Sequence, residues 1–196
     1  MFQSKPVVFF LLKAILIYGL LSFPPLSFDT SYANFYRSIN NFYFKTICKT
    51  GFVNFNQAKG KYDTRMVIGN YARMMPGDKT TVISRPLNTH YSGYMPTILL
   101  LALTLATPFS WKRKSFSLLS GLVLLTLFIV FKQWIHILFL CLHNPWIQLY
   151  NFSTTQKQII EYLYPKTVEF IGTSWFMVVV IWLLVSFRKN DLETIA

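Results

Sequence analysis

Four long apolar stretches, separated by polar segments, form the main pattern along this chain of 196 residues. A helix needs about 20 consecutive apolar residues to cross the hydrocarbon core of a bilayer. The pattern therefore predicts transmembrane helices over residues 1–23, 94–111, 115–142 and 168–187. The predicted fold class is a mainly α membrane protein, with four transmembrane helices and a small extracytoplasmic α+β domain between the first two. Lys13 interrupts the first stretch and can snorkel to the cytoplasmic interface.

The first part of the polar segment 24–93 has the pattern of an amphipathic helix. Asp29 or Thr30 can cap its N-terminus, and apolar residues then recur at helical spacing. We expect this helix to rest on the membrane surface or to pack under the extracytoplasmic domain. The residues of its apolar face are Tyr32, Phe35, Tyr36 and Ile39, with Phe42 or Tyr43.

Beyond this helix, short runs of β-branched and aromatic residues alternate with glycine and proline, which predicts a small antiparallel sheet. The second outer segment, 143–167, is predicted to hold a short helix that ends at Pro165. Residues 188–196 would form a cytoplasmic tail. The expected strands lie at 52–55, 64–68 and 80–84.

The basic run Lys112–Lys114 sets the predicted orientation. Lys and Arg in short loops stay on the cytoplasmic side, because such loops are poorly translocated when they are basic. Lys5, near the start, and Arg188-Lys189, after the last stretch, agree with this orientation. Both termini would then be cytoplasmic, and segments 24–93 and 143–167 would lie outside. The long outer segment is itself basic, but the charge bias weakens in loops beyond about 60 residues.

Composition supports a membrane protein. Hydrophobic residues make up 53% of the chain and charged residues only 13%, so the apolar content exceeds what a soluble domain of this size needs. The net charge of +12 fits cytoplasmic flanks and an exposed basic loop that contacts anionic lipid headgroups. Nucleic acid is not an expected partner, because the basic residues are dispersed and form no recognisable binding module.

No set of residues in the sequence predicts catalysis, a cofactor or a metal ion. Cys141 and His143 are two apart and would not face each other on a helix. His90, His136 and His143 have no acidic neighbour that would complete a metal site. We interpret Cys48 and Cys141 as two separate thiols; a disulfide between them is the alternative.

The candidate functional residues are instead those of a partner-binding surface. The outer segments and helix ends carry aromatic and basic side chains suited to contact with lipid and with a larger membrane protein or enzyme. The residues we select as a possible interface are Arg85, His90, Tyr91, Tyr94, Lys132 and Trp134.

One stretch of the chain also resembles a known group. It contains His90-Tyr91-Ser92-Gly93-Tyr94-Met95-Pro96, then Leu101-Ala102-Leu103, Ala106-Thr107-Pro108, Trp111-Lys112-Arg113-Lys114 and Gly121-Leu122. This order is similar to that of the small inner-membrane proteins found with exosortases in bacteria that sort surface proteins, where a Gly-Tyr-x-Pro enters a helix that ends in Thr-Pro and a basic turn. The resemblance covers about a fifth of the chain.

The resemblance implies a bacterial inner-membrane location and a role in surface-protein sorting. It assigns no catalytic residue, because the exosortase enzymes resemble transpeptidases with a membrane-embedded Cys, Arg and His, and this chain lacks a Cys in the matching Ser/Ala-Cys-Ser/Gly setting. It is also shorter than those enzymes.

The sequence therefore favours a non-enzymatic accessory protein whose extracytoplasmic domain binds or presents a substrate or a partner enzyme. Two alternatives remain at this point. One is a structural subunit of a larger membrane complex, such as a secretion or respiratory assembly. The other is an interfacial enzyme that acts on a lipid-linked substrate, for which Arg85, His90, Cys141 and His143 are the residues to consider.

Overall fold

The structure, a computed structural model, describes residues 4–23, 28–45, 51–58, 62–73, 82–147, 149–170 and 172–186. Within these ranges the helices are α1 (Ser4–Ser22), α2 (Phe28–Phe44), α3 (Met95–Ala106), α4 (Trp111–His143), α5 (Thr154–Tyr164) and α6 (Gly172–Ser186). The strands are β1 (Gly51–Gln57), β2 (Thr64–Asn70) and β3 (Val82–Leu87). Short helical turns lie at η1 (Tyr71–Arg73), η2 (His90–Tyr94), η3 (Pro145–Ile147) and η4 (Pro165–Glu169).

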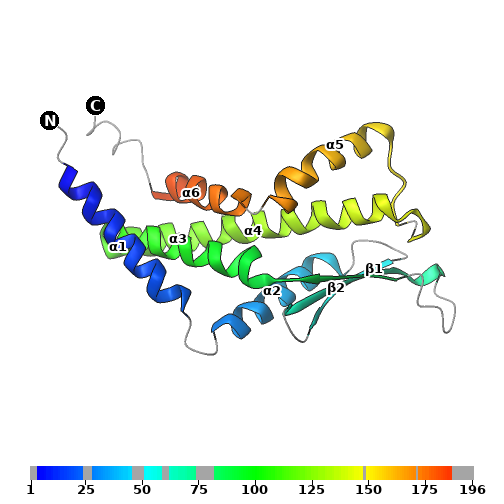
Figure 1. Ribbon diagram of the computed structural model, residues 1–196, viewed down its shortest axis with the longest axis horizontal. Coiled ribbons are helices and arrows are strands. Elements are labelled where there is room, and N and C mark those ends of the chain that lie inside the picture. The colour runs from blue at the N-terminus through cyan, green and yellow to red at the C-terminus, as the bar shows by residue number, and fades with distance from the viewer. Residues whose placement is uncertain are drawn as a thin grey trace.

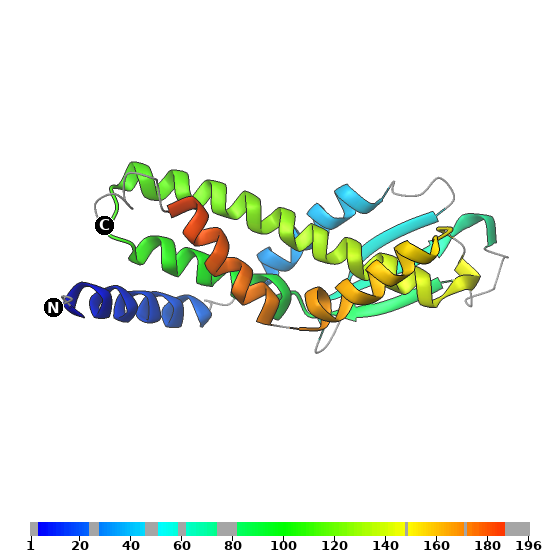
Figure 2. The ribbon, with the colours of Figure 1, turned by 90° about the horizontal axis from the view of Figure 1, so that it is seen from above.

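The molecule is elongated, and α4 runs along most of its length (Figure 1). At one end, which we call the helical end, α1, α3 and α6 lie together with residues 111–131 of α4. At the other, the sheet end, the three strands and α5 lie along the second half of α4 (Figure 2). The helix α2 packs on the sheet and reaches back along α4, where its Phe35 and Tyr43 lie beside Leu119, Val123 and Leu127. The start of α1, the turn between α3 and α4, and the end of α6 all lie at the far side of the helical end.

The sequence correctly predicts a small antiparallel sheet. Its order is β1-β2-β3, with β1 and β3 as the edge strands. Alternate side chains of a strand point to the same face. Those that point toward α2 and α4 are buried and join the second half of α4 in one hydrophobic core. The strand residues of this core are Val53, Phe55, Met66, Ile68 and Ile83. Of the predicted third strand, residues 80 and 81 lie outside the described residues, and β3 begins at Val82.

The predicted amphipathic helix is present as α2, but a different face is buried. Tyr36 and Phe44 pack against Phe55, whereas Phe35 is exposed. The spacing places Arg37 on the polar face, yet Arg37 is buried. Its guanidinium can be buried there since it donates a hydrogen bond to the carbonyl oxygen of Asp63 at 3.0 Å. Polar contacts with the sheet thus decide how α2 is turned about its axis.

A second polar contact completes the edge of the sheet. The Asn41 amide nitrogen donates to the carbonyl oxygen of Phe55 at 2.9 Å, and its amide oxygen accepts from the backbone N–H of Phe55 at 2.7 Å. One side chain therefore satisfies the donor and the acceptor that β1 presents at its open edge at this position.

The prediction of four transmembrane helices is wrong for the described residues. Within them, α4 is the one helix that is both long enough and apolar enough to cross a bilayer by itself, with 33 residues. The 12 residues of α3 and the 15 of α6 extend about 18 Å and 22 Å, short of a hydrocarbon core of about 30 Å. The described apolar part of α1, Val7–Ser22, also falls below the length of a full span.

The local structure explains why the apolar stretches overestimate the spans. The predicted 94–111 helix begins with the π-helical turn η2, and α3 ends at Ala106, before Thr107 and Pro108. The predicted 168–187 helix is interrupted, because α5 with η4 and α6 meet at an angle of 82°. Counting apolar residues does not reveal either break.

The basic run at the start of α4 closes the far side of the helical end. Arg113 donates through Nη2 to the carbonyl oxygen of Ser186, the last residue of α6, at 2.6 Å. Lys114 donates through Nζ to the carbonyl oxygen of Leu105, in the last turn of α3, at 2.9 Å. Cations at helix C-termini stabilise the exposed carbonyls and the negative end of the helix dipole. The run therefore holds three helices together.

Candidate functional site

Large apolar side chains are exposed over much of the surface of the helical end. Soluble monomers rarely expose contiguous apolar patches of more than a few hundred Å². This surface is therefore suited to lipid or to the apolar face of another protein. Its exposed residues include Val7, Phe9, Leu12, Leu16 and Leu20 on α1, Phe116, Leu119, Val123 and Leu127 on α4, and Phe176, Val179 and Leu184 on α6.

Three polar contacts within the helical end show how hydroxyl and indole groups are satisfied there. Ser117 donates to the carbonyl oxygen of Val185 at 2.9 Å, and Thr104 donates to that of Leu100 at 2.8 Å. The indole N–H of Trp182 donates to the hydroxyl of Thr107 at 3.2 Å. Such internal bonding is what an apolar environment requires of hydroxyl and indole groups.

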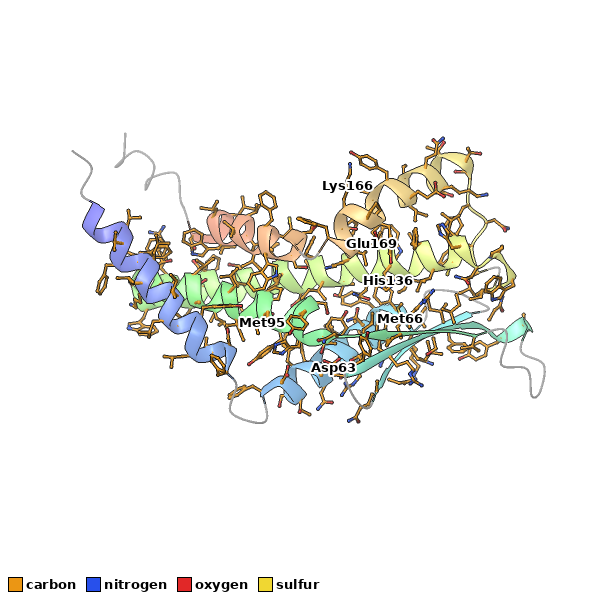
Figure 3. All side chains as sticks on the ribbon, viewed as in Figure 1. Asp63, Met66, Met95, His136, Lys166 and Glu169 are labelled. Atoms are coloured by element: carbon orange, nitrogen blue, oxygen red, sulfur yellow. The ribbon has the colours of Figure 1, made fainter. Side chains whose placement is uncertain are left out.

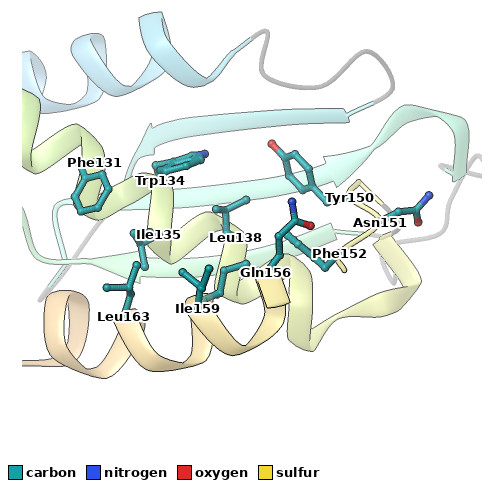
Figure 4. A pocket seen from close by; sticks show the side chains of 11 residues that line it. Phe131, Trp134, Ile135, Leu138, Tyr150, Asn151, Phe152, Gln156, Ile159 and Leu163 are labelled. Atoms are coloured by element: carbon teal, nitrogen blue, oxygen red, sulfur yellow. The ribbon is translucent and has the colours of Figure 1, made fainter. Parts of the chain in front are cut away.

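An apolar groove lies between the second half of α4 and α5, with a volume of about 380 Å³ (Figure 4). Its floor is formed by buried side chains, Ile135 and Leu138 of α4 and Ile160 of α5. Exposed side chains form its rim, and polar ones lie toward the end of the groove that is far from Phe131. The remaining lining residues are Phe131, Trp134, Tyr150, Asn151, Phe152, Gln156, Ile159 and Leu163.

A capping box fixes the start of α5, and thereby one wall of the groove. The Ser153 hydroxyl accepts from the backbone N–H of Gln156, and the Gln156 side-chain oxygen accepts from the backbone N–H of Ser153 at 3.0 Å. At its other end, α5 is held to α4 by a ring stack in which the Tyr164 and Phe139 centroids are 3.6 Å apart. The capping box thus sets where α5 begins, and the ring stack holds the other end of α5 against α4.

A partly buried polar cluster lies at the boundary between the helical end and the sheet end, beside the hydrophobic core that continues through both. Lys132 is buried and donates through Nζ to the Ser174 hydroxyl of α6 at 3.0 Å. The charges of Lys132 and of Arg85 on β3 lie near His136, which faces the region between α4 and the sheet (Figure 3). Partial burial raises the pKa of Tyr164; the carboxylate of Glu169 adds to the rise and Arg85 opposes it. These residues bring α4, α5, α6 and β3 together.

A second junction joins α2 to η2. The His90 Nδ1 lies 3.1 Å from a carboxylate oxygen of Asp29, and the Tyr91 ring contacts His90 edge-on with centroids 5.0 Å apart. Thr89 donates through its backbone N–H and its hydroxyl to Asp63, the hydroxyl bond being 2.6 Å long. The turn η2 is thus anchored both to the start of α2 and to the loop before β2.

Tyr32 and Gly93 make the closest contact at this junction. The Tyr32 ring packs edge-on against Tyr94 with centroids 5.6 Å apart, and its hydroxyl accepts from Thr97 at 3.4 Å. Burial raises the pKa of Tyr32 to about 12, so its hydroxyl stays neutral at physiological pH. A Cβ at position 93 would lie 2.9 Å from Cε1 of the Tyr32 ring, so the packing requires a glycine there.

The six residues predicted as an interface lie in three places. Trp134 is on the rim of the groove. Lys132 is buried, and Arg85, exposed on an edge strand, lies near it across His136. His90, Tyr91 and Tyr94 all belong to η2. Of these three, Tyr91 is the most exposed, at 58%, and Tyr94 is buried.

The residues considered for an interfacial enzyme lie in different surroundings. Cys141 is buried in the core between α4 and the sheet, and His143 is exposed, with Nδ1 3.1 Å from the carbonyl oxygen of Phe139. His90 lies at the α2 junction and Arg85 on β3. Cys48, the other half of the alternative disulfide, lies outside the described residues. Within the described ranges, no group of three or more His, Cys, Asp and Glu side chains is placed to hold a metal ion.

The comparisons with known proteins found no matching protein family, no similar curated protein and no similar solved structure.

The groove is not predicted from the sequence, although the apolar pattern of each of its two walls is visible there. Ile159, Ile160 and Leu163 are recognisable as one face of a short helix, and Phe131 to Leu138 as the continuation of an apolar helix. What the sequence does not provide is that the two faces meet. A search for two amphipathic segments joined by a connection short enough for antiparallel packing would have proposed the pair.

We predict that Gly93→Ala destabilises the protein by about 1–3 kcal/mol, because the added methyl group must displace the Tyr32 ring. Thermal unfolding in detergent measures the effect. Gly19→Ala in α1 is the matched control, since nothing lies within 4 Å of its added Cβ. Adding Tyr32→Ala to Gly93→Ala should remove the clash, so that Gly93→Ala costs less in that background. Equal unfolding temperatures for Gly93→Ala and Gly19→Ala would contradict the account.

Proposed function

We propose that this chain is a membrane-anchored accessory protein without catalytic activity of its own. In this proposal the helical end lies in the bilayer. Among the described helices α4 alone is long enough to cross it by itself, while α3 and α6 pack against its first half and α1 packs against α3. The sheet end stands outside the membrane and binds a partner protein or holds its substrate close to the membrane surface.

The observation that carries the proposal is the concentration of exposed aliphatic side chains at the helical end: among the described residues, the exposed Val, Leu and Ile side chains lie on α1, the first half of α4 and α6, apart from Ile159. The other large apolar side chains exposed at the sheet end are aromatic. Moving one exposed Leu or Phe side chain out of water contributes about 1.5–3 kcal/mol. The exposed side chains of α1, α4 and α6 together would thus contribute some tens of kcal/mol on entering a hydrocarbon phase. That favours insertion strongly over a soluble state.

The proposed orientation follows from charge. The turn that carries Lys112–Lys114 lies at the far side of the helical end, together with the start of α1 and the end of α6. Basic residues in short loops are retained in the cytoplasm. We therefore place this side of the molecule in the cytoplasm and the sheet end on the opposite side of the membrane.

The accessory role is favoured over catalysis by the arrangement of the candidate residues. Cys141 is enclosed in the core, and His143 is turned toward its own helix. By contrast, η2 presents Tyr91 beside His90 and Asp29 at the boundary between the two ends, where a membrane-bound partner would meet it. The resemblance of this segment to exosortase-associated proteins suggests an exosortase-type enzyme as that partner.

Reporter fusions in a bacterial host test the anchoring and the orientation. A reporter that is active only outside the cytoplasm should be active when fused after Lys61 and inactive when fused after Arg188. Fractionation should find both fusions in the membrane and not released by alkaline carbonate. Activity after Arg188, or release of the chain by carbonate, would contradict the proposal.

The role of η2 in partner binding is tested by a charge substitution at Tyr91. We expect Tyr91→Arg to abolish co-purification of the partner from native membranes in a mild detergent, because the new charge would need to be desolvated in the interface. Tyr71→Arg is the control, since Tyr71 is equally exposed, at 63%, but lies beyond β2 at the far side of the sheet end. Loss with both variants, or with neither, would refute a specific role for this surface.

A further inference from the structure

We infer that the groove between α4 and α5 binds one acyl chain of a membrane phospholipid that slides out of the bilayer along α4. This inference rests on the proposed membrane anchoring. It adds a ligand site at the sheet end, which the proposed function does not require.

The groove continues the exposed apolar face of the helical end without a break. Val123 and Leu127 are exposed on α4, and Phe131, Trp134 and Leu138 follow them at spacings of three or four residues. Residues at these spacings share one face of a helix. The face that would contact lipid in the membrane therefore becomes the wall of the groove. Lys132, the one charged residue in this part of α4, lies on another face, where it is buried against Ser174 of α6. A lipid chain beside Val123 can reach Trp134 while it stays on apolar surface throughout.

The shape of the groove suits a single chain. Its volume of about 380 Å³ is at the lower end of the range of ligand pockets. The floor is already closed by Ile135, Leu138 and Ile160, and the open rim is formed by Phe131, Trp134 and Ile159. A helix of a partner protein, about 10 Å wide with its side chains, would rest on this rim and leave the floor unfilled. A chain of methylene groups can lie between the two helices and contact both walls.

The polar groups of the groove lie where the linkage of a lipid would be. The side chains of Asn151 and Gln156 stand toward the end far from Phe131 (Figure 4). Carboxamides both donate and accept hydrogen bonds, so they suit the ester carbonyls and the uncharged part of a headgroup. The terminal methyl of the chain would then point toward the membrane and the headgroup away from it. A lipid that leaves the bilayer with its headgroup first has this orientation.

Photo-crosslinking tests the inference. The full chain is reconstituted in nanodiscs that contain a phosphatidylcholine with a photoreactive group near the end of one acyl chain, and adducts are mapped by peptide mass spectrometry. We expect adducts on residues 116–127 of α4 and also on the groove walls, at Trp134, Ile159 or Leu163.

The variant Ile159→Arg places a charge on the rim, at an exposed position that α5 tolerates. It should lower the groove adducts about tenfold, the effect of a change of about 1.4 kcal/mol in binding, and leave those at 116–127 unchanged. Gln158→Arg, exposed on the same helix but not in the groove, is the control and should change neither.

The outcomes separate the two proposals. Adducts at 116–127 with none on α5 would overturn the groove inference and leave the anchoring intact. A chain that fails to enter nanodiscs would overturn the anchoring itself. Groove adducts that persist equally in Ile159→Arg would overturn the site. A groove without lipid adducts because a peptide occupies it would overturn the choice of ligand.

Discussion

The structure depends on one helix that must suit two surroundings. The first half of α4 forms the helical end with α1, α3 and α6, and its second half forms the core of the sheet end with β1 to β3 and α5. A continuous helix of 33 residues satisfies its own backbone hydrogen bonds, so only its side chains need to change along its length. Lys132 marks the boundary between the two halves: its amine is buried and bonded to Ser174 of α6, and beyond it α4 packs against the sheet and α5.

The remaining contacts fix other elements to α4 at three levels. At the far side of the helical end, Arg113 and Lys114 bond the last carbonyls of α6 and α3. At the boundary, η2 joins α2 through His90 and Asp29. In the sheet end, Asn70 on β2 donates to the carbonyl oxygen of Ile147, which follows α4. Each level uses polar groups to set position, while the apolar contacts between the levels provide most of the stability.

The strands and the presence of α2 could be predicted from the sequence, because each depends on local patterning. The hydrogen bonds that the basic run makes to the ends of α6 and α3 could not, since they depend on the packing of three helices. The number of spans could not, since the ends of α3 and α6 are set by η2, Pro108 and a sharp bend that hydropathy does not register. The buried face of α2 was also missed, because Arg37 is satisfied by a carbonyl from a distant loop. The groove lies between two segments and needs their packing to be known. The exposed Tyr91 could be selected in advance, but the burial of Lys132 could not.

Spin labels along α4 can show which solvent each of its halves contacts. Single cysteines at Phe116, Val123 and Leu127, at His143, and at Trp146 in the turn that follows α4 can be spin-labelled in liposomes after Cys48 and Cys141 are replaced by serine. We predict that oxygen, which concentrates in the bilayer, collides most with the first three labels. A water-soluble nickel complex should collide most with the last two. Equal access of the nickel complex to both groups would show that α4 lies in one solvent, and would contradict a first half in the bilayer and a second half outside it.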